Sequence, residues 1–326
     1  MMDKKEKSEA EAAGQPETAG NPRVLVVGSI NMDLVIRVAS IPQPGQTIAG
    51  RSFSTLPGGK GANQAVAAAR CGGQVSMIGR VGNDDFGQRL LVGLRGYGVD
   101  VSGVMISEGV STGVATITVD DKGENAICIA GGANLLVSRE DIEEQEERIA
   151  GADIVVMQLE IPPETVCYTI EKAHQHQVPV ILNPAPAPEK IHPGLYQADV
   201  LIPNQDETAL LCGEPVNDIH GAKLAGTALI RRGAKTVVVT LGRRGALAIT
   251  AEHMIHVPPF SAKIVDTAGA GDAFCGAFAV AYAREKDLFQ ATRFAAAAGA
   301  LACHKFGAQP SMPHLDMVLR LIQRSC

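Results

Sequence analysis

The sequence has few aromatic residues: tryptophan is absent, and 4 tyrosines and 8 phenylalanines are spread over 326 residues. Proteins that bind single-stranded nucleic acid stack bases on aromatic rings, so this composition argues against that class. A formal net charge of −6 also argues against a general polyanion binder. No stretch reaches about 18 uninterrupted apolar residues, so the sequence predicts no transmembrane helix. We therefore expect neither a nucleic-acid partner nor a membrane partner.

Paired cysteines and a secretion signal are also missing. None of the 7 cysteines stands in a CxxC pair, and they are scattered along the chain, as expected of free thiols in a reducing cytosol. Residues 1–21 are polar and lack the apolar core of a signal peptide, so they predict a disordered tail. The sequence thus indicates a cytoplasmic protein with one domain over residues 22–326.

The chain does contain a series of short apolar runs separated by helical patterns. The runs are nearly continuous, which is typical of strands buried on both faces. They lie at residues 24–27, 75–78, 154–157, 180–182, 200–202 and 237–241. The helical patterns lie at residues 62–70, 84–95, 138–149, 164–177, 221–232 and 270–284. This alternation predicts an α/β fold with a mostly parallel sheet and helices on both of its faces.

Two stretches depart from this alternation. Residues 34–38 lead into a turn-rich segment. Residues 112–119 and 125–129 alternate on either side of a short polar loop, which indicates a β-hairpin. These pieces predict a small β-sheet at the edge of the main sheet. It is either a lid over a ligand or an ordinary edge hairpin.

The strongest local motif is Asp266-Thr-Ala-Gly-Ala-Gly-Asp272. Its glycines permit a tight turn into a helix, whose first N–H groups and dipole would form an anion hole at residues 268–271 for a transferring phosphoryl group. An aspartate repels phosphate, but it is useful there as a general base that takes a proton from an attacking hydroxyl. We therefore predict this role for Asp272, and the alternative is that it only caps the helix.

Two segments near the N-terminus predict contacts with a small polar ligand. Pro57-Gly-Gly-Lys-Gly-Ala-Asn63 opens a helix but lacks the GxxxxGK[ST] pattern of a P-loop. Gly28-Ser-Ile-Asn-Met-Asp33 follows a strand without the GxGxxG pattern of a dehydrogenase. Asn31 and Asp33 lie two residues apart, so in a strand they share one face and could grip vicinal hydroxyl groups.

Two further loops follow predicted strands, which is where open α/β sheets bind ligands. Thr240-Leu-Gly-Arg-Arg-Gly245 is a glycine-rich loop after one apolar strand. Asn204-Gln-Asp-Glu207 follows another, and its Asn and Glu could orient phosphate and hydrated Mg²⁺.

Together these five segments resemble the ribokinase branch of the ribokinase-like (PfkB) sugar kinase family. The two most specific stretches are GGKGANQAVAAAR and DTAGAGDAFCGAF, and Asn183-Pro-Ala-Pro-Ala187 and Lys305-Phe-Gly-Ala-Gln-Pro-Ser311 add to the likeness. The resemblance implies a three-layer αβα fold with a mostly parallel central sheet. It also implies a small β-sheet lid from about residues 31–60 and 111–130. The implied activity is ATP-dependent phosphorylation of D-ribose at its 5-hydroxyl, by a homodimer formed through the lid.

Site residues follow from the same resemblance. The implied catalytic set is the base Asp272 with the anion-hole residues Gly269, Ala270 and Gly271. The implied sugar-binding residues are Asn31, Met32, Asp33, Gly59, Lys60, Gly61, Ala62, Asn63, Glu160 and Asp272. The implied nucleotide-binding residues are Asn204, Thr240, Leu241, Gly242, Arg243, Arg244, Gly245, Gly271 and Asp272. Glu207 is expected near the Mg²⁺ that accompanies ATP. An activating K⁺ is expected at Asp266, Ala268, Ala302, Lys305, Gly307 and Ser311.

One position departs from the family pattern: Ala296 stands where relatives often place His or Asn near the adenine. This puts one base contact in question but not the reaction. Two alternatives remain open. A kinase for a related pentose or nucleoside, such as 2-deoxyribose, differs by few contacts. A non-catalytic sugar sensor on the same fold is more distant, because Asp272 and the GAGD turn are intact.

Overall fold

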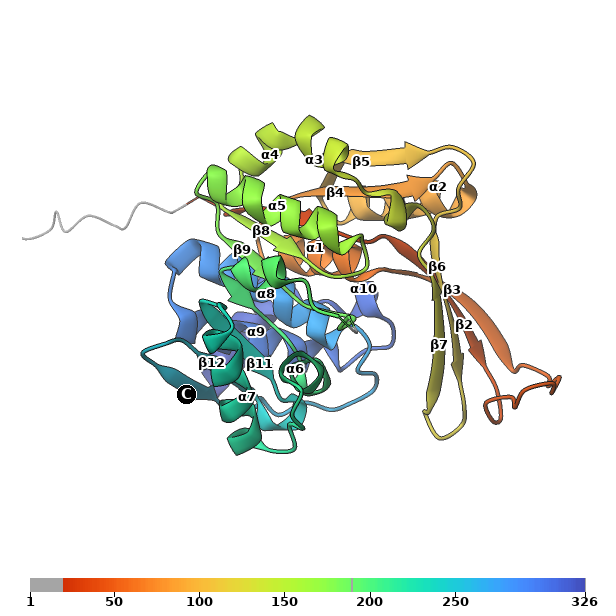
Figure 1. The fold of residues 1–326 in the computed structure, drawn as a ribbon. Coiled ribbons are helices and arrows are strands. Elements are labelled where there is room, and N and C mark those ends of the chain that lie inside the picture. The colour runs from red at the N-terminus through yellow and green to blue at the C-terminus, as the bar shows by residue number, and fades with distance from the viewer. Residues whose placement is uncertain (1–19, 189, 326) are drawn as a thin grey trace, which may run out of the picture.

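The computed structural model describes residues 20–188 and 190–325, so nearly all of the tail predicted at residues 1–21 lies outside the described residues. In this part of the chain the strands form a nine-stranded sheet and a four-stranded sheet (Figure 1). The larger sheet has the strand order β13-β12-β11-β10-β9-β8-β1-β4-β5. Its strands are β1 (Arg23–Val27), β4 (Gln74–Gly82), β5 (Val99–Ser107), β8 (Ile154–Met157), β9 (Val180–Leu182), β10 (Val200–Leu201), β11 (Thr236–Thr240), β12 (Ala246–Ile249) and β13 (Met254–Val257).

The larger sheet is mostly parallel, as predicted. Every pairing from β11 across to β5 is parallel, and only β12 and β13 join antiparallel at one edge. The central strands β1, β8 and β9 are apolar and almost entirely buried, since helices cover both faces. In a parallel sheet the carboxyl ends of the strands meet at one edge, and that edge gathers the loops that carry the predicted motifs.

Helices pack on the two faces of this sheet in two separate apolar cores. One face carries α1 (Lys60–Arg70), α2 (Asp85–Gly96), α8 (Ala270–Glu285), α9 (Leu288–Ala302) and α11 (Leu315–Arg324), with the short α10 (Ala308–Ser311) beside α1 and α9. The other face carries α3 (Arg139–Glu144), α4 (Glu146–Ala150), α5 (Pro163–Gln175), α6 (Gln205–Cys212) and α7 (Ile219–Arg231). The fold is therefore the three-layer αβα architecture that the resemblance implies.

Small residues bring α8 against α1. A Cβ added to Gly276 would lie 2.4 Å from the backbone oxygen of Gln64, so any larger side chain would push the two helices apart. Alanines of both helices fill the remaining contact and are fully buried. This close packing places the first turn of α8, with Asp272, beside the first turn of α1, with Asn63 and Gln64.

The smaller sheet has the order β3-β2-β6-β7 and projects from one end of the body (Figure 1). Its strands are β2 (Asn31–Arg37), β3 (Ser52–Gly58), β6 (Gly113–Val119) and β7 (Asn125–Ala130), all inside the segments in which we predict a lid. Asn31 pairs with Gly58, and Asp33 pairs with Leu56. Asn31 and Asp33 thus share one face of β2, as their spacing predicts.

One helix differs from the prediction. The sequence predicts a continuous helix over residues 138–149, but α3 and α4 are separated at Gln145. Four glutamates at positions 140, 143, 144 and 147 stand three or four residues apart, and like charges at that spacing destabilise a helix. Among the described helices, none combines the length and the hydropathy needed to cross a bilayer.

Candidate active site

The predicted motifs meet at the carboxyl edge of the larger sheet. The loops after β1, β8, β10 and β11 lie there, together with the N-terminal turns of α1 and α8. Asp272 stands in the first turn of α8, whose N-cap residue, Gly269, has a left-handed φ of 76°. A Cβ on Gly269 would lie 2.9 Å from the Cα of Ala308, so both the backbone conformation and the space require glycine.

Asp272 is buried and hydrogen-bonded through both carboxylate oxygens. Nδ2 of Asn63 donates to Oδ2 at 2.9 Å, and Nε2 of Gln64 donates to Oδ1 at 3.1 Å. Burial raises the pKa of Asp272 above its usual range, while the charge of Lys60 and the two amide donors act in the opposite direction. Oδ1 of Asn63 is buried without a partner among the described residues, so it is available to accept from a ligand hydroxyl.

Lys60 is the cation of a strongly acidic cluster. Burial alone lowers the pKa of Lys60, but the carboxylates of Asp272, Glu160 and Glu207 outweigh it, so the net shift is upward. Asp33 faces the same cluster: burial, with the charges of Glu160 and Asp272, raises its pKa to about 7. The cluster therefore places one buried positive charge among several carboxylates, and burial raises the pKa of Asp33, Asp272 and Glu207.

The carboxylate of Glu160, in the loop after β8, is held by a residue that follows β1 and by the first residue of α1. Oε2 of Glu160 accepts from the hydroxyl of Ser29 at 2.5 Å and from the backbone N–H of Lys60 at 3.1 Å. Glu160, which is predicted to bind the sugar, is thus fixed at the point where the loops after β1 and β8 meet. Ser29 lies inside the GSINMD segment, but its role was missed from the sequence.

Asn134, in the 3₁₀ turn η1 (Gly132–Leu136), was also missed. Its Nδ2 donates to Oδ1 of Asn31 at 2.7 Å and to the carbonyl of Ile30 at 3.2 Å, and its Oδ1 accepts from the N–H of Ile30 at 2.9 Å. Nothing in the residues around position 134 signals this contact, which joins segments 103 residues apart.

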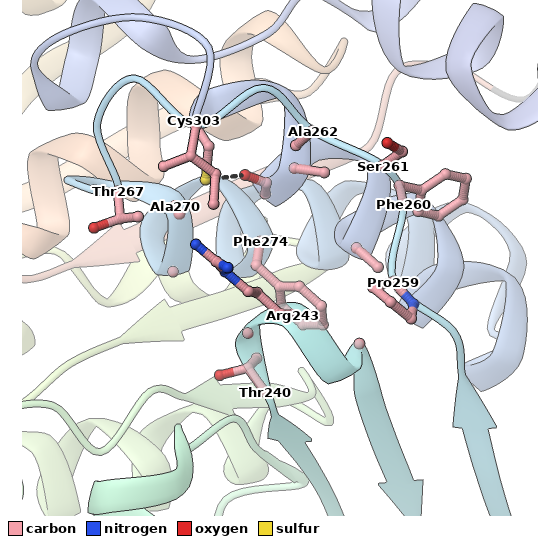
Figure 2. Close-up of a pocket in the computed structure, with 17 residues that line it drawn as sticks. Thr240, Arg243, Pro259, Phe260, Ser261, Ala262, Thr267, Ala270, Phe274 and Cys303 are labelled. Atoms are coloured by element: carbon pink, nitrogen blue, oxygen red, sulfur yellow. Dashed lines mark hydrogen bonds between the residues drawn. The ribbon is translucent and has the colours of Figure 1, made fainter.

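A cavity of about 900 Å³ adjoins the start of α8 (Figure 2). The predicted residues Thr240, Gly242, Arg243, Gly245, Ala270 and Gly271 line it, with Phe260, Phe274, Ala296 and Gly299 on the other walls. Figure 2 shows the Arg243 side chain reaching from the loop after β11 toward Thr267 and Ala270. A Cβ on Gly271 would meet nothing within 4 Å, so the backbone there is accessible from the cavity.

Other residues predicted for the nucleotide lie outside this lining. The guanidinium of Arg244 donates to the carbonyl of Asn217, and Leu241 is buried in the core. Asn204 and Glu207 form a reciprocal capping box at the start of α6, with two hydrogen bonds of 2.8 Å. Burial raises the pKa of Glu207, and its charge still reaches Lys60 and Asp272.

The residues predicted for K⁺ surround the loop that precedes α8. The carboxylate of Asp266 accepts from the N–H of Ala268 at 3.0 Å and of Gly307 at 2.9 Å, so it ties the turn predicted to form the anion hole to the loop before α10. The hydroxyl of Ser311 donates to the carbonyl of Ala308 at 2.7 Å and keeps its lone pairs for another partner. In the part of the chain that the structure describes, no cluster of three or more His, Cys, Asp or Glu could hold a metal. A cation here would depend on one carboxylate, a hydroxyl and backbone carbonyls, which is a ligand set that hard cations accept.

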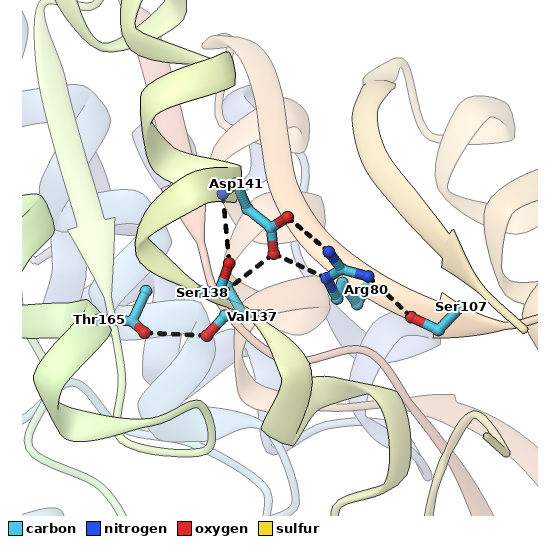
Figure 3. Close-up of polar contacts among 6 residues, drawn as sticks. All are labelled: Arg80, Ser107, Val137, Ser138, Asp141 and Thr165. Carbon is cyan, nitrogen blue, oxygen red and sulfur yellow. Dashed lines mark hydrogen bonds and ion pairs between the residues drawn. The ribbon is translucent and has the colours of Figure 1, made fainter.

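Polar side-chain contacts join elements of the body to one another and to the residue that leads into the smaller sheet. Arg80 of β4 binds both oxygens of Asp141 in α3 at 2.7 and 2.6 Å, and also donates to Ser107 of β5 (Figure 3). Asp84 accepts from the N–H of Thr112 at 2.8 Å and from its hydroxyl at 2.6 Å, just before β6 begins. The Asp84 contacts hold the residue before β6 against the N-terminus of α2.

Comparison with known proteins now identifies the family. The model of the pfkB family of carbohydrate kinases matches residues 21–315. The chain belongs to the pfkB family. As a pfkB carbohydrate kinase it transfers a phosphoryl group to a sugar hydroxyl, and its fold is the one seen in ribokinase structures.

Three relatives are similar to this chain over most of its length. Deoxyribokinase of Salmonella typhimurium is 36% identical, over 90% of this chain and 96% of its own length. The bifunctional ribokinase/ribose-5-phosphate isomerase A of Fructilactobacillus sanfranciscensis is 37% identical over 93% of this chain, which spans only 56% of that protein. The structure of Arabidopsis thaliana ribokinase complexed with ribose and ATP superposes with a TM-score of 0.86 at 34% identity, over 93% of this chain and 99% of that one.

Proposed function

We propose that this pfkB kinase phosphorylates D-ribose at its 5-hydroxyl, with MgATP as the donor, in one kinase domain over residues 22–326. The observation that carries the proposal is the position of Asp272. It is buried at the start of α8, hydrogen-bonded to Asn63, and next to Gly271 on the wall of the 900 Å³ cavity. A base at this point lies between a sugar on the α1 side and a nucleotide in the cavity.

The sugar is held by side chains of opposite hydrogen-bonding character. Asn31 and Asp33 share one face of β2, and a pair of that kind fits two neighbouring hydroxyls. Lys60, Asn63 and Glu160 complete the grip from α1 and the loop after β8. The predicted members Met32, Gly59, Gly61 and Ala62 belong to the same two segments and supply backbone and shape.

The ionised carboxylate of Asp272 takes the proton of the 5-hydroxyl while that oxygen forms a bond to the γ-phosphorus. The bond between the γ-phosphorus and the bridging oxygen breaks, and ADP leaves with the bond electrons. The N–H groups at residues 268–271 and the N-terminus of α8 stabilise the negative charge of the phosphoryl group in transit. The smaller sheet acts as the lid that excludes water from this reaction.

Mg²⁺ bound to the ATP phosphates would neutralise their charge, and Asn204 and Glu207 are the residues of this chain that would hold it in place. Asp266 and Ser311, with carbonyls of Ala268, Ala302, Lys305 and Gly307, would hold an activating K⁺ next to the anion-hole turn. We also place the enzyme in the cytoplasm, since the cysteines that the structure describes are all free thiols.

Ribose is preferred over 2-deoxyribose because Asn31 and Asp33 form a paired grip suited to two vicinal hydroxyls, and 2-deoxyribose offers only one of them. Sequence identity does not separate the two substrates, since deoxyribokinase and ribokinases match this chain at similar levels. The assignment therefore rests on the site, where a buried polar group without its hydroxyl partner would penalise the deoxy sugar.

A coupled assay with the purified full-length chain tests the proposal. MgATP is supplied with D-ribose, 2-deoxy-D-ribose, other pentoses and a ribonucleoside, and we expect the highest kcat/KM for D-ribose. Asp272→Asn should lower kcat by about 10²–10⁴-fold, while a thermal shift still reports ribose binding. Asp316→Asn, on the exposed face of α11, is the matched control.

Each other outcome has a definite meaning. Most of the turnover remaining in Asp272→Asn would show that Asp272 is not the base. A higher kcat/KM for another sugar or for the nucleoside would replace ribose as the substrate. Binding of ribose with no ADP formed from any acceptor would favour the sensor.

A further inference from the structure

A chain of buried amide side chains stands behind Asp272. Nε2 of Gln64, in α1, donates to Oδ1 of Asp272 at 3.1 Å and to Oδ1 of Asn183 at 3.2 Å. Oε1 of Gln64 accepts from Nε2 of Gln158 at 2.7 Å. Gln64 and Gln158 are both 0% exposed, so neither can reach a substrate from its position. These amides interact with the reaction only through Asp272.

Hydrogen bonding fixes the direction of this chain. An ionised carboxylate only accepts, so Gln64 must present its NH₂ group to Asp272. Its carbonyl oxygen then faces Gln158, which must donate. The NH₂ group of Asn183 donates to the carbonyl of Ile202 at 2.8 Å, so the side-chain oxygen of Asn183 faces Gln64. One orientation of the three amides satisfies all of these bonds.

The chain of amides is anchored to two inner strands of the larger sheet. Gln158 directly follows β8 and Asn183 directly follows β9, two fully buried strands of the larger sheet. A Cβ on Gly28 would lie 2.1 Å from Oε1 of Gln158, so the glycine after β1 is what leaves room for this amide. Gln64 is therefore held at its carbonyl end by the sheet while its NH₂ group holds Asp272.

We propose that Gln64 is the positioning residue of the catalytic base: it anchors Oδ1 of Asp272 and thereby leaves Oδ2 as the atom that takes the proton. Oδ2 is bonded to Asn63, whose Oδ1 is unpartnered among the described residues and which belongs to the sugar-binding segment. The two consecutive residues of α1 thus divide the carboxylate into an anchored oxygen and a reactive oxygen. This inference rests on the proposed function, because it needs Asp272 to be the base.

Charged and titratable groups face Asp272 from several elements, and their charges act on its pKa together with the Gln64 hydrogen bond. They are Lys60 from α1, Asp33 from β2, Glu160 from the loop after β8, Glu207 from α6 and the thiol of Cys275 from α8 itself. The Gln64 hydrogen bond lowers the pKa of Asp272 against the effect of burial. Its loss would raise that pKa, so a base that must be ionised would need a higher pH.

The test replaces the amide by a side chain of similar length that cannot donate. In Gln64→Met we expect kcat for ribose to fall at least about tenfold, because an aligned general base is worth about 10²–10⁴-fold. The KM for ribose should stay within about threefold, since no sugar contact is removed. The acid limb of the kcat/KM pH profile should move to higher pH.

A second variant keeps the experiment decisive if Gln64→Met does not fold. Gln158→Met leaves the NH₂ group of Gln64 in place but removes the donor that fixes its orientation, so it should shift kcat and the acid limb in the same direction by less. Gln145→Met is the matched control. The Gln145 amide accepts from Arg148 at 2.7 Å, and it lies between α3 and α4, on the face of the larger sheet opposite to α1. We expect that variant to match the wild type in both readouts.

A folded Gln64→Met with wild-type kcat and an unmoved acid limb overturns the inference, and Gln158→Met decides in the same way if it is the only folded variant. Loss of thermal stability with neither change would show that the amides only fill the core. Asp272→Asn, measured in parallel, separates this result from failure of the proposed function. If that variant remains active, the base itself is misassigned, whereas an inactive Asp272→Asn beside a fully active Gln64→Met rejects only the positioning role.

Discussion

Nδ2 of Asn134 donates to Oδ1 of Asn31 over 2.7 Å, and this bond joins the turn η1, which follows β7, to the start of β2. Because Oδ1 of Asn31 is occupied from behind, its NH₂ group is the end left to donate to a sugar hydroxyl. Asn134 is also bound to both backbone polar groups of Ile30, so its amide has one orientation. A residue that touches no sugar thus orients one that we assign to sugar binding.

Asn134→Leu should therefore weaken ribose binding more than it slows the chemistry. Leaving buried partners of a lost hydrogen bond unsatisfied costs about 1–3 kcal/mol, so we expect the KM for ribose to rise about tenfold or more. We expect kcat to change by less than about threefold, since Asp272 is untouched. Steady-state kinetics at saturating MgATP measures both. Asn83→Leu, an exposed amide bonded to Glu108, is the control, and an unchanged KM in Asn134→Leu would contradict the role.

Asp33 makes stability depend on pH in the absence of sugar. Burial first, and then the charges of Glu160 and Asp272, raise its pKa from 3.8 to about 7. Between these values the folded state keeps a proton that the unfolded state loses, so the contribution of Asp33 to stability falls as pH rises through this window. It is fully unfavourable above pH 7. The buried carboxylate of Asp33, which we assign to binding sugar hydroxyls, therefore lowers the stability of the sugar-free protein at neutral pH.

Asp33→Asn removes this penalty. The melting temperature of the sugar-free variant should exceed that of the wild type by an amount that grows from pH 4 to pH 7 and then levels off. Thermal unfolding at intervals across pH 4–8 measures this difference. Asp85→Asn, at an exposed position of α2, should show no such growth. An equal difference between Asp33→Asn and the wild type at pH 5 and pH 8 would show that Asp33 titrates normally.

The sequence could predict those parts of the fold that depend on local pattern. Continuous apolar runs such as residues 154–157 predict buried parallel strands, and the glycine motif before Asp272 predicts a helix start, because each depends only on neighbouring residues. The two-residue spacing of Asn31 and Asp33 likewise predicts their shared face. The family resemblance then added roles that local pattern could not supply.

Contacts between distant segments could not be predicted in this way. Gln64 lies in one of the two most specific stretches of the chain, yet its hydrogen bonds to Asp272 and Asn183 span 208 and 119 residues. They depend on how α1 packs against α8 and against the end of β9. Arg243 and Arg244 are adjacent and chemically identical, but only the first lines the cavity while the second caps a carbonyl near α7. The conformation of the short turn η3 (Gly242–Arg244) decides between them.

K⁺ should activate the enzyme through Asp266. This carboxylate joins the N–H of Ala268 to that of Gly307, so a cation bound beside it would hold the anion-hole turn in place. We expect kcat to fall several-fold when KCl is replaced by NaCl at constant ionic strength, and Asp266→Asn should abolish the difference. Initial rates at saturating ribose and MgATP measure this, with Asp316→Asn as the control. Equal rates in both salts would remove K⁺ from the mechanism.

The smaller sheet, which we propose to be a lid, exposes apolar side chains that a second copy of the chain would cover. All six residues of the edge strand β7 are exposed, with Ile127 54% accessible, and Phe53 on the opposite edge strand is 62% accessible. Their pairing registers place Ile127 and Phe53 on opposite faces of the small sheet, so both faces carry apolar surface. Unpaired edge strands of this kind associate readily, and a stable interface buries about 1,200–2,000 Å² in total.

We therefore expect a homodimer formed through the lid, which sedimentation velocity at micromolar concentrations would detect. Ile127→Glu and Phe53→Glu each place a charge on one face of the sheet, and at least one of them should shift the protein to a monomer because a buried unpaired charge is costly. Leu210→Glu, at a 68% accessible position on α6, is the control and should remain a dimer. A wild-type monomer would contradict the dimer, and a dimer that survives both lid charges would place the interface elsewhere. If the dimer holds the smaller sheet in place, the monomeric variant should also show a raised KM for ribose with Asp272 intact, since Asn31 and Asp33, which we assign to sugar binding, belong to its strand β2.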